Sequence, residues 1–154
     1  MISIEAASQK HVDEIAAIEI ENFSEPWSKN AVSFEIKHAI CFAAWDAENS
    51  AVAGYATMRQ IFDEGHISNI AVAKKYQKQG IGNLLITALI QAAIANNING
   101  LTLEVRESNH AALALYNKHG FVKEGIRKNY YSYPNEDAII MWKYLNKGAG
   151  ECEN

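Results

Sequence analysis

A short loop between a strand-like and a helix-like segment carries the most specific binding signal in this sequence. Residues 77–82 read Gln-Lys-Gln-Gly-Ile-Gly, a Gln-x-x-Gly-x-Gly pattern that opens directly onto an apolar helical repeat. Glycine lets a backbone approach a ligand closely, and the free N–H groups and dipole of a helix N-terminus attract an anion. Lysines stand at positions 74, 75 and 78, and no Asp or Glu occurs from Ala71 to Leu103. The pattern suits a pyrophosphate, and a glycine-containing turn with solvated lysines is the open alternative at this point.

The sequence lacks other signatures of nucleotide binding and of covalent or metal catalysis. The loop has neither the Lys-Ser/Thr pair of a P-loop nor the third glycine of a dinucleotide fingerprint, and no Gly-x-Ser-x-Gly elbow occurs. Cys41 and Cys152 form neither a Cys-x-x-Cys pair nor a disulfide framework. The five histidines show no metal-ligand spacing. We therefore expect no metal and no role for the cysteines in catalysis.

The surrounding pattern predicts the helices and strands that would position this loop. Apolar residues recur every three to four positions from Val12 to Phe23, which indicates a first helix, and Ser28 can cap a second. Gly80 and Gly82 open a third helix, and Ser108-Asn109 can cap a fourth that stops at Gly120. Alternating or apolar segments predict strands at Ile2–Glu5, Cys41–Trp45, Ala51–Ile61, His66–Ala73, Leu101–Val105, Phe121–Arg127 and Ala138–Tyr144.

The order of these elements predicts one α/β domain. A strand, two helices and an antiparallel meander are followed by a β-α-β-α-β-β run, which suits a single mixed central sheet with helices on both faces. A chain of 154 residues suits one domain that buries about 70% of its unfolded surface. We assign the domain to residues 1–146. Residues 147–154 contain Gly and acids without an apolar pattern, and we expect them to be a disordered tail.

Several segments make the sequence resemble the GNAT acetyltransferase superfamily. They are residues 69–82, 103–109 and 114–121, and the Gln-x-x-Gly-x-Gly loop within the first is similar to the superfamily's coenzyme A pyrophosphate motif. Residues 23–28, 127–131 and 136–141 resemble one branch, the RimI family of ribosomal-protein-alanine N-acetyltransferases. The resemblance runs from Ile2 to about Leu145. It implies the single-domain GNAT fold, acetyl-CoA as cosubstrate, and acetyl transfer to the N-terminal α-amine of a protein.

The resemblance also implies how the cosubstrate is held. The strand segment Ile70, Ala71 and Val72 would pair with the pantetheine arm, and the Val72 N–H would polarise the thioester carbonyl. The pyrophosphate would lie on Lys78, Gln79, Gly80, Ile81, Gly82 and Asn83, with Asn109 also on the cofactor. From the residues alone, the strand segment is a buried strand end and Asn109 is a good helix N-cap.

Two further residues acquire catalytic roles through the resemblance. Glu104 would be the base that takes a proton from the incoming ammonium, and Tyr116 would be the acid that protonates the leaving thiolate. By pattern alone, Glu104 belongs to the polar face of an edge strand and Tyr116 is a core tyrosine at helical spacing from Ala112. The implied reaction is direct attack on an already activated thioester, without a covalent enzyme intermediate.

The acceptor is the part of the reaction that the residues define least. Pro26-Trp27, Phe34 and the aromatic loop 130–134 are candidate walls of a peptide groove, while Glu19, Glu21, Glu25 and Glu35 could favour a basic peptide. Solvated helix faces and a packed loop explain the same residues. The resemblance points to the N-terminal alanine of a small-subunit ribosomal protein. The alternatives are a small-amine or lysine acetyltransferase and a non-catalytic acetyl-CoA sensor.

Charge and hydropathy limit the remaining classes of partner. The formal net charge of −4 argues against general nucleic-acid binding, so that only the patch formed by Lys74, Lys75 and Lys78 supports an RNA-binding alternative. The longest apolar stretch, Leu84 to Ala95, is shorter than the ~20 residues of a membrane span. The first 14 residues do not have the pattern of a signal peptide. We expect a cytoplasmic protein with no membrane or nucleic-acid partner.

Overall fold

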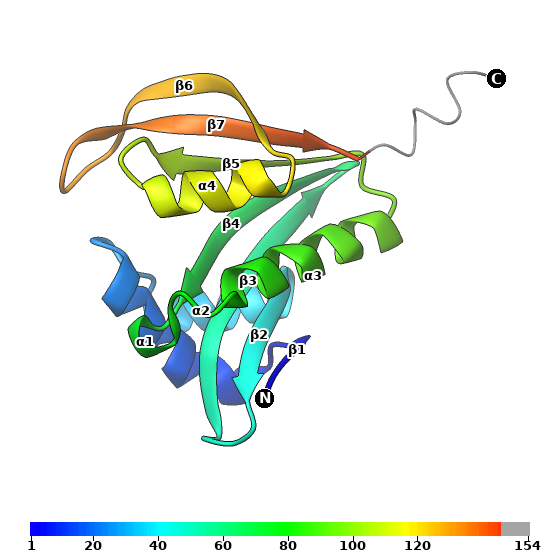
Figure 1. Ribbon diagram of the computed structural model, residues 1–154, viewed down its shortest axis with the longest axis vertical. Coiled ribbons are helices and arrows are strands. Elements are labelled where there is room, and N and C mark those ends of the chain that lie inside the picture. Colours follow the sequence, from blue (N-terminus) through cyan, green and yellow to red (C-terminus); the bar gives the residue numbers. More distant parts are fainter. Residues whose placement is uncertain (146–154) are drawn as a thin grey trace.

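A computed structural model describes residues 1–145 and places them in one mixed α/β domain (Figure 1). Its seven-stranded sheet has the order β1-β2-β3-β4-β5-β7-β6. The strands are β1 (Ile2–Ala6), β2 (Ile40–Asp46), β3 (Ala51–Ile61), β4 (Glu64–Val72), β5 (Gly100–Arg106), β6 (Val122–Tyr131) and β7 (Glu136–Tyr144). The helices are α1 (Val12–Asn22), α2 (Lys29–His38), α3 (Ile81–Ala95) and α4 (His110–Lys118), with 3-10 turns at Gln9–His11 and Lys74–Tyr76.

The helices cover both faces of the sheet, as the element order predicts. Successive residues of a strand point to opposite faces. On β3, the Tyr55 hydroxyl bonds to Glu19 of α1, whereas a Cβ built on the preceding Gly54 would lie 3.2 Å from the Leu85 side chain of α3. In Figure 1, α3 and α4 lie in front of the sheet and α1 and α2 behind it. The predicted fold class is confirmed.

The feature that creates a site is the separation of β4 from β5. These two strands run parallel and pair only at Glu64–His66 with Gly100–Thr102. On its other side β4 carries a bulge at Ser68, because Thr57 pairs with Asn69 while the next residue of β3 pairs with Ile67. A bulge bends its strand and increases the local twist. Beyond the three paired residues β4 and β5 diverge, which opens a V in the middle of the sheet (Figure 1).

The core beneath this V is built by the apolar repeat of α3. Leu85, Ile86 and Leu89 are fully buried, with relative exposures of 0%. Removing such a side chain to Ala typically costs about 2–5 kcal/mol. Gly65 marks the close approach of β4 to its neighbours, because a Cβ there would lie 2.6 Å from Leu101 and 2.8 Å from Met58. The sheet is therefore held rigid where the two halves still pair.

Three details differ from the sequence-based expectation. Ser8 precedes the 3-10 turn Gln9–His11 and not α1 itself. Tyr130 and Tyr131, expected in a loop, end strand β6, and the turn that follows them is shorter. The expected tail, residues 147–154, lies outside the described residues, as does residue 146. Within residues 1–145 no helix is both long and apolar enough to span a membrane.

Candidate active site

Two cavities enter the V from opposite faces and meet in its middle. The first, of about 570 Å³, lies between the α1–α2 connection, β4, β5 and the β6–β7 turn. The second, of about 460 Å³, lies between β4, the start of α3 and α4. Asn22, Ile70, Ala112 and Tyr116 line both. A bound molecule on the α3 side can therefore reach one bound on the α1 side, which is the geometry that a group transfer between two substrates requires.

The second cavity has the character of an anion site at its α3 end. Gly80 is the N-cap of α3 and has a φ of 81°, a left-handed conformation that glycine adopts without strain. The following N–H groups of Ile81, Gly82 and Asn83 begin the helix and have no intrahelical acceptor. A helix N-terminus also carries a partial positive charge. Lys78 lines the same cavity and adds a full charge.

The open edge of β4 presents backbone groups to the middle of the V. Ala73 donates its N–H to the carbonyl of Ala53 in β3 at 2.8 Å. Because bonded and non-bonded pairs alternate along an antiparallel ladder, Ile70 and Val72 turn their N–H and C=O groups away from β3. The Val72 carbonyl accepts hydrogen bonds from the side-chain amides of Asn22 and Gln77, both at 3.2 Å. The N–H groups of Ile70 and Val72 therefore face the gap left by β5.

Most of the residues assigned to the cosubstrate lie together around this second cavity. Its lining includes Ile70, Ala71, Val72, Lys78, Gly80, Ile81, Gly82 and Asn83. Gln79 does not line it, because its exposed side chain turns back to donate to the Lys75 carbonyl at 3.4 Å. Asn109 caps α4, accepting from the Ala112 N–H at 3.1 Å, and lines the first cavity. The predicted N-cap at Asn109 is therefore present, and its implied contact with the cosubstrate stays a prediction.

Tyr116 lies at the junction of the two cavities. The side chain is 7% exposed, and its ring packs on Phe121 with 5.7 Å between centroids. Burial raises the pKa of Tyr116 above its usual range, with the neighbouring Tyr131 adding to the effect. The hydroxyl therefore keeps its proton at neutral pH. No hydrogen bond from this hydroxyl is found within residues 1–145, which leaves it free to donate to a ligand.

Glu104 lies on β5 and lines the first cavity, opposite the open edge of β4. Its carboxylate accepts a hydrogen bond from Nε of Arg127 on β6 at 3.1 Å, and its side chain is 30% exposed. The sequence did not single out Arg127 for this contact. Glu104 and Tyr116 therefore reach the same cavity from different elements, one from the sheet and one from α4.

Arg106 organises the outer wall of the first cavity, and sequence reasoning missed it. Its guanidinium donates to the carbonyls of Ser132 at 3.0 Å and Pro134 at 2.9 Å, and lies 4.4 Å from the ring centroid of Tyr131. It also pairs with Glu136 at 3.1 Å. The other oxygen of Glu136 accepts the Ser108 N–H at 2.7 Å. Hydrogen bonds from Ser108 and Arg106 hold the pKa of Glu136 below its usual range.

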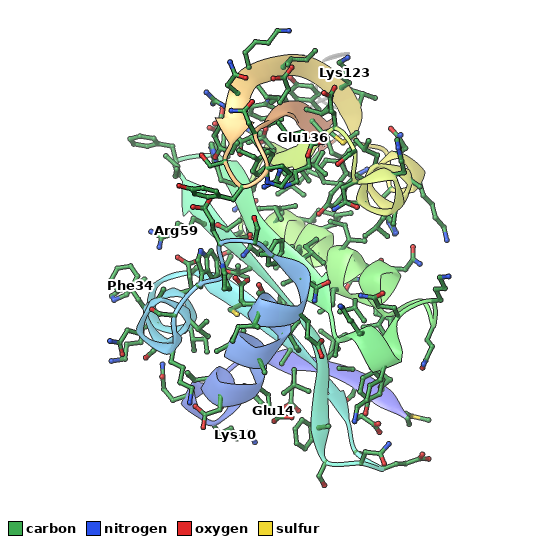
Figure 2. The ribbon with its side chains drawn as sticks, turned by 90° about the vertical axis from the view of Figure 1, so that its left-hand side faces the viewer. Lys10, Glu14, Phe34, Arg59, Lys123 and Glu136 are labelled. Atoms are coloured by element: carbon green, nitrogen blue, oxygen red, sulfur yellow. The ribbon has the colours of Figure 1, made fainter. Side chains whose placement is uncertain are left out.

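Of the four acids expected to favour a basic peptide, Glu19 and Glu25 line the first cavity and Glu21 and Glu35 do not. Glu35 is buried on α2, where it accepts from Thr57 and pairs with Arg59, outside the cavity lining. Phe34 also lies outside the lining, with the Arg59 guanidinium 5.5 Å from its ring centroid, and Figure 2 shows these two residues beside each other at the edge of the view. The apolar stripe of α2 shows which face packs on the protein but not which face meets the groove, so the sequence could not decide whether Phe34 and Glu35 line it.

Glu21 and Glu19 both accept hydrogen bonds from the protein itself. Glu21 accepts the N–H of Lys74 at 3.0 Å, and Glu19 is 1% exposed. Glu25 is exposed on the first cavity, and Trp27 lines it as expected. Within residues 1–145 no group of three or more His, Cys, Asp or Glu side chains is placed to hold a metal ion.

Comparison with known proteins agrees with this geometry. Residues 12–121 match the acetyltransferase (GNAT) family. The chain belongs to this family. The ribosomal protein bS18-alanine N-acetyltransferase of Escherichia coli (strain K12) is 39% identical over 140 residues, which are 88% of this chain and 93% of that protein. The resemblance to the RimI family is thus confirmed.

Solved structures of GNAT proteins have the same architecture. The crystal structure of the ribosomal-protein-alanine N-acetyltransferase from Escherichia coli superposes with a TM-score of 0.85 at 34% identity, covering 94% of each chain. A GNAT family acetyltransferase from Elizabethkingia anophelis with acetyl-CoA bound gives a TM-score of 0.75 at 26% identity, covering 94% of this chain and 98% of that one. The GNAT fold of this chain is therefore established.

Proposed function

We propose that this GNAT protein transfers the acetyl group of acetyl-CoA to the N-terminal α-amine of a protein. The observation that carries the proposal is the meeting of two cavities at Tyr116 and at the open edge of β4. One cavity suits a pyrophosphate and a pantetheine arm. The other has an acidic and aromatic lining that suits a peptide. Similarity to the Escherichia coli bS18-alanine N-acetyltransferase supports an N-terminal alanine of a small-subunit ribosomal protein as acceptor, in the cytoplasm.

In this proposal the protein binds acetyl-CoA mainly through backbone groups, with one charged side chain beside them. The N–H groups of Ile81, Gly82 and Asn83 and the Lys78 ammonium would hold the pyrophosphate. The exposed edge of Ile70–Val72 would pair with the amides of the pantetheine arm. When bound, acetyl-CoA supplies a thioester that is already activated toward attack by an amine. The protein then has to position the two substrates, polarise the carbonyl and move protons.

Three residues of the V would perform these tasks. The Val72 N–H donates a hydrogen bond to the acyl oxygen, where negative charge develops during attack. Glu104 takes a proton from the acceptor ammonium, which is needed because an α-amine has a pKa of ~8. Tyr116 donates its hydroxyl proton to the departing sulfur. No side chain of the protein is acylated in this scheme, and Cys41 takes no part because burial raises the pKa of its thiol to about 12.

Measurement of coenzyme A release with matched acceptors tests the proposal. One peptide begins with alanine and continues with basic residues, a second is the same peptide with a blocked α-amine, and a third acceptor is a polyamine. We expect release with the first and none with the other two. Release with the blocked peptide or the polyamine alone would indicate a lysine or small-amine acetyltransferase. Tight acetyl-CoA binding without release would indicate a sensor.

A further inference from the structure

Glu19 is a buried carboxylate at the wall of the first cavity that the proposed chemistry does not use. It lies in the last turns of α1, is 1% exposed and lines the cavity. One carboxylate oxygen accepts the Trp27 N–H at 2.8 Å. The other accepts the Tyr55 hydroxyl and the Asn69 side-chain amide, the latter at 2.6 Å. Three of the roughly four acceptor sites of a carboxylate are thus occupied by donors of the protein itself, which fits a structural contact and not a second base.

The donors of Glu19 come from the segments that shape the acceptor cavity. Trp27 belongs to the α1–α2 connection, of which Phe23, Ser24, Glu25 and Trp27 itself line the cavity. Asn69 follows the bulge at Ser68 and immediately precedes Ile70, the first residue of the open edge of β4. Tyr55 lies on β3, the rigid centre of the sheet. Glu19 therefore ties the α1–α2 connection to β3 and to the β4 bulge, on the acceptor side of the V.

The energetics of this contact favour a dedicated role. Burial raises the pKa of Glu19, while the bonds from Trp27 and Asn69 partly offset that effect. A buried carboxylate is costly unless its donors are well placed, and an amide in the same place is uncharged and cheaper to bury. However, the amide presents an N–H to groups that are themselves donors. The acid thus orders three segments in a way that its isostere does not reproduce.

We infer that Glu19 is a positioning residue that fixes the α1–α2 connection against the β4 bulge and thereby sets the affinity for the acceptor. The inference rests on the proposed function, since the acceptor is the amine-bearing substrate of that reaction. Glu19 acts only through Trp27, Tyr55 and Asn69. It affects the acceptor side of the V and leaves the cosubstrate side unchanged.

Glu35 provides a matched control for Glu19. It is also a buried glutamate, on the neighbouring helix α2, and it bonds to Thr57 and Arg59 on the same face of β3. Its partners do not line either cavity. Glu19→Gln and Glu35→Gln therefore remove equivalent charges at equivalent depth, but only the first disturbs the acceptor wall.

The test measures the KM for the alanine peptide, kcat and the Kd for acetyl-CoA. We expect Glu19→Gln to raise the acceptor KM about tenfold, the size expected when a hydrogen bond to a charged group is lost. The acetyl-CoA Kd should change less than about twofold, and Glu35→Gln should alter neither value. Tyr55→Phe removes one donor and should raise the acceptor KM by a smaller factor. An unchanged KM, or a fall in kcat alone, would overturn the inference.

Hydrogen exchange separates this inference from the proposed function. In Glu19→Leu, which removes both carboxylate oxygens, the Trp27 amide loses its acceptor, so exchange in residues 23–28 should accelerate relative to wild type and to Glu35→Leu. If wild-type protein acetylates no α-amine, the proposed function is wrong and exchange alone decides whether Glu19 fixes this wall. Unchanged exchange in residues 23–28 would overturn the inference whatever the activity.

Discussion

Replacing Tyr116 by Phe isolates the proposed proton transfer to the leaving thiolate. The change removes only the hydroxyl, and the ring can keep its packing against Phe121. Positioned acids contribute roughly 10²–10⁴-fold to a rate. Burial raises the Tyr116 pKa, whereas a thiol titrates near ~8.5. Transfer of the proton from the tyrosine to a thiolate is therefore unfavourable by itself, because the thiol that forms is the stronger acid. We therefore expect the low end, a loss of about 10²-fold in kcat, which corresponds to about 2.7 kcal/mol.

Tyr76 supplies a control for this experiment. It is also 7% exposed and lines the second cavity, but its hydroxyl donates to Asp46 at 2.5 Å. Tyr76→Phe should lower the melting temperature because a hydrogen bond to a charged group is lost, and should leave kcat nearly unchanged. Tyr116→Phe should do the reverse, with an unchanged acetyl-CoA Kd. A Tyr116→Phe enzyme with kcat within threefold of wild type would refute the acid role.

Three other changes test separate parts of the site. Glu104→Gln should reduce kcat/KM most at low pH, where more of the α-amine (pKa ~8) is protonated, and a pH–rate profile parallel to wild type would exclude the base role. Gly80→Ala should lower the free energy of unfolding by about 1–2 kcal/mol, because its φ is 81°, and should weaken acetyl-CoA binding. The control Gly125→Ala, whose Cβ would lie 3.6 Å from Ile140, should do neither. Equal acetyl-CoA Kd values for the two variants would count against the anion site. Burial, with Lys118 and Lys143, lowers the pKa of His119, so the unfolded chain binds its proton more readily and stability is lost as pH falls below ~6.5. Between pH 8 and pH 5 the melting temperature should fall further for wild type than for His119→Gln, and equal falls in melting temperature would be the contrary result.

The fold and the cosubstrate side of the site were predictable because their signals are local. Each strand and helix of residues 1–145 has its own periodicity, cap or glycine, such as Gly80 before α3 and Asn109 before α4. In the proposed function, the Gln-x-x-Gly-x-Gly loop would bind through backbone groups that follow one another in the chain. A short segment therefore specifies most of the second cavity, and of the residues assigned to the cosubstrate Gln79 and Asn109 do not line it.

The acceptor side could not be predicted because distant segments build it. Arg106 of β5 joins Ser132 and Pro134 of the β6–β7 turn, and Glu19 of α1 joins Asn69 of β4. Nothing near Glu19 or Glu35 in the sequence distinguishes the acid at the cavity from the one outside it. That distinction depends on the rotation of each helix about its axis, which tertiary packing determines.

The most direct test of the proposed function is the position of the acetyl group in the product. A peptide with a free N-terminal alanine and one internal lysine offers both an α-amine and an ε-amine to the same enzyme and acetyl-CoA. Fragment mass spectrometry of the product then locates the acetyl group. We predict that it lies on the alanine α-amine and that the lysine remains free. Acetylation of the lysine with a free α-amine would contradict the proposed function.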